Sequence, residues 1–181
     1  SSCSMTVPSK SSFEIEKGMG SVKISGVHNK IQLEKVLGNL VLNDVGEVRV
    51  EKVGGNFSVQ GAGTVRVEKV GGNLVLSGLD SFSGEKIGGS CKAKAISGNF
   101  SLEKIGGSFK TQAIAGLLQV ERVGGSFSGQ QVSLTGELHV GGDIRLKGFD
   151  LSGQHLELKA VGNISLESSD AFESTKFGMR P

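Results

Sequence analysis

The side chains that most often carry out catalysis or bind metals are few in this chain of 181 residues. Its three histidines are His28, His139 and His155. A metal site or a histidine-based acyl-transfer site needs a histidine close to further ligands or to a nucleophile. These three histidines fall at unrelated positions of the repeat described below, and we interpret them as surface polar residues.

Carboxylates allow one further catalytic hypothesis. Asp80, Asp143 and Asp150 are candidates for the acids of a polysaccharide lyase or hydrolase built on stacked strands, which needs two carboxyl groups on one face. No side of the repeat collects such a pair. The sequence therefore predicts that the chain is not an enzyme and has no catalytic, cofactor-binding or metal-binding residue.

The two cysteines are Cys3 and Cys91. Cys91 occupies an apolar position of the repeat, where a buried, unreactive thiol is expected. Cys3 precedes the first expected coil by a long distance, so we expect no disulfide between the two. Cys3 is left as a candidate for crosslinking subunits in an oxidising compartment.

Composition narrows the choice of partners. Glycine accounts for 29 residues and proline for only 2, whereas disordered low-complexity chains are enriched in both. The formal charge is +2, from 20 basic and 18 acidic side chains, which predicts no strong field for nucleic acid or anionic lipid. Apolar runs are short, so no membrane span is expected.

An internal repeat dominates the sequence. A neighbouring acidic and basic residue recur at 16/17, 34/35, 51/52, 68/69, 85/86, 103/104 and 121/122, in steps of 17 or 18 residues. A double glycine follows in register at 54/55, 71/72, 88/89, 106/107, 124/125 and 141/142. Such a short, regular period is typical of solenoids.

Apolar residues keep their register from one repeat to the next. One such set is Val22, Leu40, Phe57, Leu74, Cys91, Phe109, Phe127, Ile144 and Ile164, and a second set lies two residues later in each repeat. A spacing of two is that of a strand with one face in a core. We therefore expect an all-β, single-stranded β-solenoid: a right-handed, roughly three-sided parallel β-helix of eight to nine coils with 17–18 residues per coil.

The other repeat positions have physical explanations. The double glycine predicts a corner where φ is positive or where coils approach too closely for a Cβ atom. The position after it, Asn or Ser in most repeats, predicts a hydrogen-bonded ladder. The acidic and basic positions predict a solvated stripe of charge that has little net effect on stability.

Three runs carry a resemblance to known proteins: Val-Gly-Gly-Asn-Phe-Ser-Val, Val-Glu-Lys-Val-Gly-Gly-Asn-Leu-Val-Leu and Gly-Asn-Phe-Ser-Leu-Glu-Lys-Ile-Gly-Gly. They resemble the β-solenoid repeats of bacterial adhesin-type proteins, which carry Val-Gly-Gly-Asp units. More distantly, the coil length resembles that of bactofilins, cytoskeletal β-helices that polymerise without nucleotide. The resemblance covers roughly residues 12 to 167, and this chain has Asn or Ser where Asp is usual in those repeats. It implies a surface or scaffold role and no catalytic residues.

The ends of the repeat suggest the function. We expect a polar N-terminal tail at 1–11, the β-solenoid at 12–167 and a C-terminal tail or cap at 168–181. The exposed strand edges at the ends of a solenoid must be capped or paired. We therefore expect a structural protein that assembles with itself, head to tail, into a filament or extracellular fibre. The alternative is a monomeric adhesin, a rod that binds a cell-surface or matrix ligand. An extracellular or cell-surface location is expected, with a cytoplasmic cytoskeletal one as the alternative.

Overall fold

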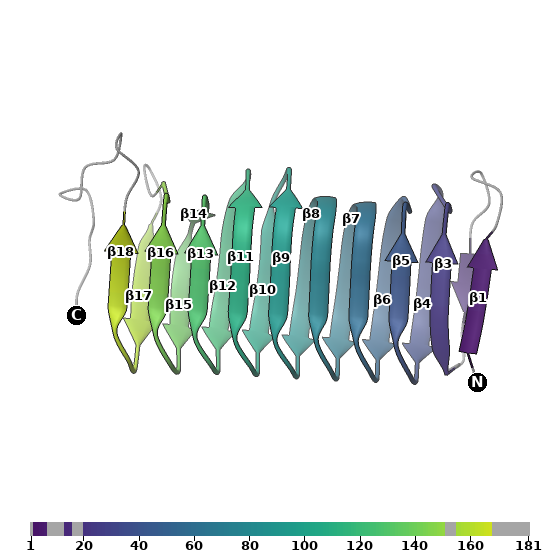
Figure 1. Cartoon of the computed structure of the whole chain (residues 1–181), viewed down its shortest axis with the longest axis horizontal. Helices are drawn as coiled ribbons and strands as arrows, with labels where there is room; N and C mark the ends of the chain where they lie inside the picture. The colour runs from purple at the N-terminus through teal and green to yellow at the C-terminus, as the bar shows by residue number, and fades with distance from the viewer. Residues whose placement is uncertain (1, 7–12, 16–19, 151–154, 168–181) are drawn as a thin grey trace.

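The computed structural model describes residues 2–6, 13–15, 20–150 and 155–167. Within these ranges every regular element is a β-strand, and the strands pair in parallel. The partners are 17 or 18 residues apart in most of the chain, so each strand pairs with the same part of the next coil. The predicted all-β solenoid is therefore confirmed (Figure 1).

The strands form two rows that run along the whole molecule. The first row contains β1 (Ser2–Thr6), β3 (Ser21–Ser25), β5 (Leu40–Asn43), the first part of β7 (Phe57–Val70), the first part of β8 (Leu74–Ile87), β9 (Cys91–Ile96), β11 (Phe109–Ile114), β13 (Phe127–Gln130), β16 (Ile144–Lys147) and β18 (Ile164–Glu167). The second row contains β2 (Phe13–Ile15), β4 (Lys30–Val36), β6 (Glu47–Val53), the second parts of β7 and β8, β10 (Phe100–Ile105), β12 (Leu117–Val123), β14 (Ser133–Leu134), β15 (Gly136–Val140) and β17 (Leu156–Ala160).

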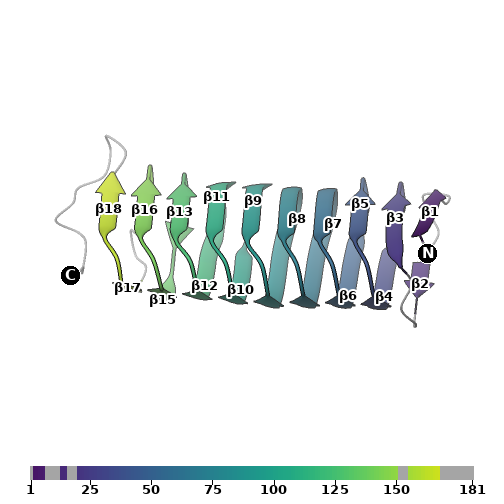
Figure 2. The ribbon, with the colours of Figure 1, turned by 60° about the horizontal axis from the view of Figure 1, so that its bottom comes forward.

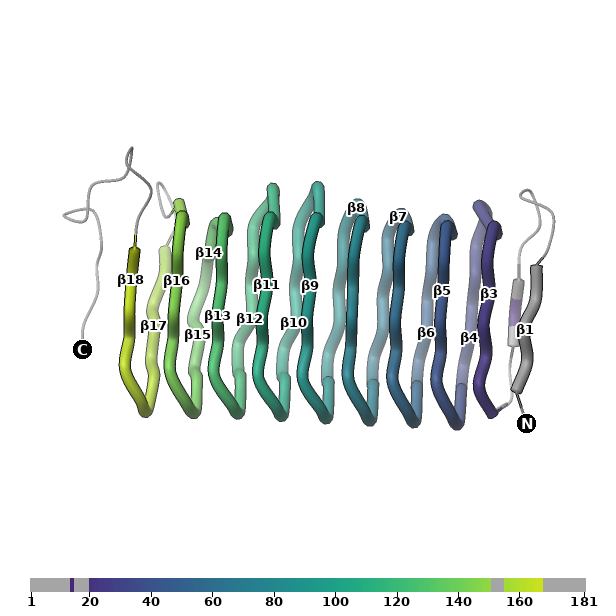
Figure 3. The backbone as a smooth tube through the Cα atoms, viewed as in Figure 1, coloured from purple at the N-terminus to yellow at the C-terminus, as the bar shows by residue number. Residues whose placement is uncertain are grey.

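The chain winds as a right-handed helix. In Figure 1 the first-row strands run upward in front, the second-row strands run downward behind, and the chain advances from right to left. A right-handed crossover is also what twisted parallel strands favour. The tube in Figure 3 follows this path through eight coils that contain both rows, from β3 to β17.

The core lies between the two rows and is made by the predicted apolar positions. The two first-row positions are buried throughout, from Val22 and Ile24 to Ile144 and Leu146. A further inward position, immediately before each double glycine, was not singled out in the sequence. It is occupied by Val36, Val53, Val70, Ile87, Ile105, Val123 and Val140, all buried.

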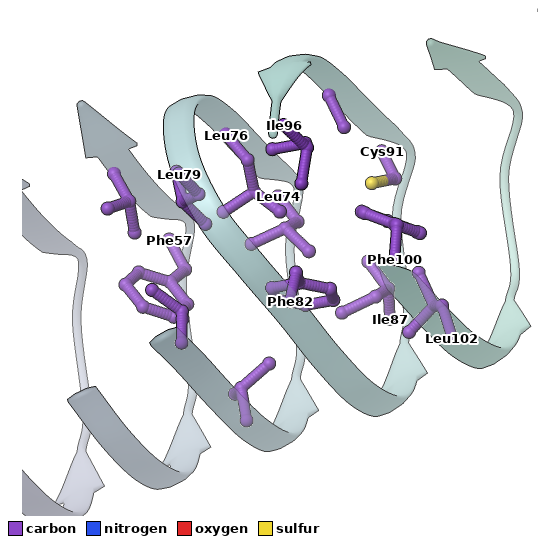
Figure 4. Close-up of a cluster of buried hydrophobic side chains, with 14 of the residues drawn as sticks. Phe57, Leu74, Leu76, Leu79, Phe82, Ile87, Cys91, Ile96, Phe100 and Leu102 are labelled. Atoms are coloured by element: carbon purple, nitrogen blue, oxygen red, sulfur yellow. The ribbon is translucent and has the colours of Figure 1, made fainter. Parts of the chain in front are cut away.

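Aromatic side chains bridge the two rows in the middle of the core. Phe82 and Phe100 of the second row stack with ring centroids 4.9 Å apart, and Phe100 stacks on Phe109 of the first row at 5.4 Å. Figure 4 shows Phe82 and Phe100 among the inward-pointing Leu and Ile side chains of these coils. Offset aromatic pairs of this kind add to the stabilisation from apolar burial.

The two kinds of corner use different devices. From the first row to the second, the chain passes through one residue with positive φ, for example Gly78 (φ 69°), and twice this residue is alanine, Ala95 and Ala113. From the second row to the first it passes through the double glycine. There the glycines are needed for close approach, because a Cβ atom on Gly88 would lie 2.5 Å from the carbonyl oxygen of Gly71.

A bend gives the coil its third, short side. In β4, β6, β10 and β12 the alternation of buried and exposed residues breaks at the acidic–basic pair, where two successive residues are exposed. The strand turns there before it reaches the double glycine, and Figure 2 shows the second-row strands curling at this end. The cross-section thus has two long sides and one short side.

The N-terminal boundary differs from the expected one. Ser2–Thr6 form β1, which pairs in register with Ser21–Ser25, so the solenoid includes part of the segment expected to be a tail. The first coil has the acidic–basic pair Glu16 and Lys17 but Gly18 and Gly20 in place of a double glycine. The signal for its first strand is only the alternation of Ser2, Cys3, Ser4 and Met5. The C-terminal segment 168–181 lies outside the described residues.

Candidate functional surfaces

The three histidines lie in separate coils, as the repeat positions indicated. His28 precedes β4 and its Nε2 lies 3.0 Å from the carboxylate of Asp44. His139 lies in β15 and His155 just before β17. Each is a surface group, and the described residues contain no group of three histidine, cysteine or acidic side chains arranged to hold a metal ion.

His139 belongs to an ionic network that joins two neighbouring coils. Among the described residues, no other group of ion pairs has more than one contact. The Nε2 atom of His139 lies 2.8 Å from Oε1 of Glu137, and Nζ of Lys159 lies 3.2 Å from the same oxygen and 3.3 Å from Glu157. The hydrogen bond with His139, the larger cause, and the one with Lys159 lower the pKa of the Glu137 carboxyl. The hydrogen bonds that Lys159 donates to Glu137, the larger cause, and to Glu157 raise the pKa of Lys159. All of these side chains are exposed to solvent, so the network contributes little to stability.

The aspartates considered as catalytic acids are far apart. Asp80 and Asp150 follow equivalent core positions four coils apart, Leu79 and Phe149, which corresponds to about 19 Å at ~4.8 Å per rung. Asp143 lies at the other corner, where its Oδ1 accepts a hydrogen bond from the backbone N–H of Asn163 at 2.8 Å. These separations do not suit a two-carboxylate hydrolase, whose acids are about 5–9.5 Å apart.

Cys91 is buried in the first-row core column, as expected, and burial raises the pKa of its thiol well above the ordinary value. The backbone of Cys3 lies in the same column, because Cys3 pairs with Val22 and the column continues through Leu40, Phe57 and Leu74. Five rungs separate the two cysteines, about 24 Å. A disulfide between them is therefore excluded.

The predicted polar ladder is present and continuous. The side-chain oxygen of each Asn, Ser or Asp accepts a hydrogen bond from the backbone N–H of its counterpart in the next coil. Examples are Asn56 N–H to Asn39 Oδ1 at 2.8 Å and Asn73 N–H to Asn56 Oδ1 at 2.9 Å. The ladder continues through Ser90, Ser108, Ser126, Asp143 and Asn163. It satisfies backbone groups at the corner that strand pairing leaves unpaired.

The outward face of the second row is close to neutral. Its strands carry ten carboxylates against ten lysine and arginine side chains. The basic members of the acidic–basic pairs lie in register, as in Lys52 with Lys69 and Lys69 with Lys86. The acidic members lie beside them, and every member of the pairs from 34/35 to 121/122 is exposed, so the predicted solvated charge stripe is confirmed there. The pair at 16/17 lies outside the described residues.

The outward face of the first row is different. Between β3 and β16 it carries six cations and no carboxylate: Lys23, Lys92, Lys94, Lys110, Arg145 and Lys147. Three of them surround a shallow hollow of about 290 Å³, whose lining also includes Val75, Gln112, Ser128 and Gln130. None of these cations has an ion pair or hydrogen bond with another described side chain.

The sequence could have indicated this face but did not. The total charge of +2 averages the two faces, and only the six cations at alternate positions of the first-row strands distinguish them. Reading the outward positions of each row separately gives the asymmetry, but that reading requires knowing which strand segments share a row.

Comparisons with known proteins do not identify the chain: no protein-family model, curated protein or solved structure matches it. Among the described residues, no helix has the length and apolar character needed to cross a membrane.

Proposed function

We propose that this protein is a non-catalytic structural unit that associates end to end, so that the solenoid of one molecule continues into the next. The observation that carries the proposal is the state of the last described rung. Ile164 and Leu166 of β18 point toward the core but remain partly exposed, whereas Ile144 and Leu146, their partners one rung earlier, are 0% exposed.

The last rung thus presents apolar side chains and a strand edge that the regular coil would cover. β18 pairs with β16 on one side, and no described strand lies on its other side. A second molecule whose first rung lies in the same register would bury Ile164 and Leu166 and pair the edge. Burial of apolar surface stabilises by roughly 25 cal/mol per Å².

The first and last rungs are compatible in sequence. Stacking β1 of one molecule on β18 of another places the positions of Cys3 and Met5 over those of Ile164 and Leu166, and the position of Ser4 over that of Ser165. The Asn163 position continues the polar ladder toward Ser2. Along this row apolar positions meet apolar ones and no like charges meet. The contact that we propose is therefore head to tail and repeats without closing.

The test uses the full chain and two variants of the last rung. Negative-stain electron microscopy and light scattering at increasing concentration should show filaments of solenoid width for the unchanged protein. Leu166→Lys places a charge at the stacking position and should abolish assembly, whereas Ser165→Lys changes the adjacent outward position and should leave assembly intact. Circular dichroism on both variants establishes that the fold is retained.

A monodisperse particle about 43 Å long, nine rung steps of ~4.8 Å, at every concentration would contradict end-to-end assembly. It would favour the alternative of a monomeric rod that works as a cell-surface binding module. Equal assembly by the Leu166→Lys and Ser165→Lys variants would show that any filaments form by another contact. We propose an extracellular or cell-surface location for either form, and a cytoplasmic filament remains the competing one, which fractionation of the native cells would distinguish.

A further inference from the structure

The first-row face carries a concentrated basic region in the C-terminal half of the rod. We define the basic strip as the outward side chains of β9, β11, β13 and β16. They are arranged in two columns: Lys92, Lys110, Ser128 and Arg145 in one, and Lys94, Gln112, Gln130 and Lys147 in the other. The three steps of ~4.8 Å between these four rungs give the strip a length of about 14 Å.

No cation of the basic strip forms an ion pair with a described side chain. Lys92 and Lys110 are register partners on adjacent rungs, and Lys94 shares a strand with Lys92. Like charges on neighbouring strands repel and are destabilising. On the second row each such column of cations runs beside carboxylates, whereas the outward positions of β9, β11, β13 and β16 hold no carboxylate. The next residue in one of these columns is Glu167 of β18, the register partner of Lys147 at the C-terminal end of the strip. Stability alone does not favour this arrangement, whereas a bound polyanion would relieve it.

The shape and the polar groups of the strip indicate which polyanion. The hollow between Lys92, Lys94 and Lys110 has a volume of about 290 Å³, near the lower end of the ~300–1,000 Å³ typical of small-ligand sites. Its lining extends along the rod over four rungs, from Val75 of β8 to Gln130 of β13, so it suits one unit of an extended chain. Gln112, Ser128 and Gln130 lie between the cations of β9 and β11 and those of β16. Their amide and hydroxyl groups can donate to and accept from hydroxyl groups. Val75, 43% exposed, offers an apolar contact at one edge.

We propose that the basic strip binds a linear acidic polysaccharide that lies along the solenoid axis. The cations of β9, β11 and β16 contact its carboxylates, and the amide and hydroxyl groups that lie between them contact its ring hydroxyls. Nucleic acid and membranes fit this surface less well than an acidic polysaccharide does. Single-stranded nucleic acid binding relies on exposed aromatic side chains, and the six phenylalanines between residues 20 and 150 are all buried. Membrane insertion relies on a row of large apolar residues, and the strip has only Val75 at its edge.

Binding should be measured with polygalacturonate as the probe and fully methyl-esterified polygalacturonate as its uncharged counterpart. The test variant is Lys92→Gln/Lys94→Gln/Lys110→Gln. The matched control is Lys52→Gln/Lys69→Gln/Lys86→Gln, which removes the same charge from the second-row column. The test variant should weaken binding at low salt by about tenfold or more and reduce the slope of log K against log salt by about 3, one per lysine. The control variant should change affinity by less than about twofold.

Four results would overturn the proposal: no binding of polygalacturonate by the unchanged protein, equal loss in the two triple variants, equal binding of the methyl ester, or tighter binding of single-stranded DNA or phosphatidylserine vesicles. The last of these would assign the strip to another class of polyanion. All substituted lysines are exposed, so melting curves should be close to that of the unchanged chain. The test does not depend on filament formation, because the strip lies on the side of the rod and is present in a monomer.

Discussion

The close approach of coils at the double-glycine corner leads to a prediction that can be worked out quantitatively. In Gly88→Ala the new Cβ atom would lie 2.5 Å from the carbonyl oxygen of Gly71, whereas ordinary van der Waals contact begins at 3.4 Å. The two coils would have to separate by 3.4 − 2.5 = 0.9 Å. The obstructing atom belongs to the backbone, so a change of side-chain rotamer cannot relieve the contact.

That separation would disrupt the hydrogen bonds at the corner. The N–H of Gly88 donates to Val70 at 2.8 Å, that of Gly89 to Gly72 at 2.9 Å, and that of Ser90 to the Asn73 side chain at 2.9 Å. Each bond contributes about 1 kcal/mol net. We therefore expect Gly88→Ala to lower the free energy of unfolding by about 3 kcal/mol.

The control is Gly78→Ala at the opposite corner. Gly78 has φ 69°, but a Cβ atom there would lie 3.8 Å from its nearest neighbour. The left-handed conformation costs an alanine about 1–2 kcal/mol, offset by about 0.5–1 kcal/mol because glycine loses more entropy on folding. The expected net loss is about 1 kcal/mol.

Urea titration followed by circular dichroism measures the free energy of unfolding of both variants, and thermal melts measure their Tm. For a chain of this length each kcal/mol corresponds to about 2–4 °C in Tm, so Gly88→Ala should lower Tm by about 6–12 °C and Gly78→Ala by about 2–4 °C. Equal losses in the two variants would refute the argument, because they would mean that coil contact adds nothing beyond backbone conformation.

Three further predictions follow from single positions. Ala95 has φ 57°, so Ala95→Gly should raise the free energy of unfolding by about 1 kcal/mol by removing left-handed strain, as measured by urea titration; a loss of stability would contradict this. The Thr111 hydroxyl is buried without a hydrogen-bond partner, so Thr111→Val should stabilise by about 1–2 kcal/mol, and a destabilised variant in thermal melts would show that the hydroxyl is satisfied. Burial raises the pKa of Cys91, so its thiol deprotonates in the unfolded chain before it does in the folded one. The contribution of this neutral, buried thiol to the free energy of unfolding is fully present below the ordinary thiol pKa. It is lost as pH rises above that value, by up to about 1.4 kcal/mol per pH unit. In a Cys3→Ser background, stability should fall more steeply above pH 9 than in the same background with Cys91→Ala, and equal slopes would count against this assignment.

Much of the fold could be predicted from the sequence because a solenoid repeats one local pattern. Alternation at Val22 and Ile24, repeated every 17 or 18 residues, specifies both a strand and its partner in the next coil. The first rung could not be placed in the same way. Ser2–Thr6 pair with β3, but the step between register partners there is 19 residues, and Gly18 and Gly20 stand where later coils have a double glycine.

The surfaces were less predictable than the core. The sequence identified the acidic–basic stripe and the polar ladder because each recurs in most coils, and the structure places both as expected. The basic strip has no such period: Lys92, Lys94 and Lys110 stand at positions that are Ser, Val, Asn or Gln in most of the other coils. A repeat analysis discards such departures as variation.

The sequence by itself determined the solenoid, its period, its inward positions and the need for glycine at one corner. These follow from local alternation and from the rule that identical positions stack on one another in successive coils. Only the tertiary structure decided which corner is crowded and which is left-handed, and which charged positions share a face. Those properties depend on distances between segments 17 or more residues apart, set by how the coil closes, and no local pattern contains them. The balanced net charge of the chain therefore became one near-neutral face and one basic face only when the two rows of strands were formed.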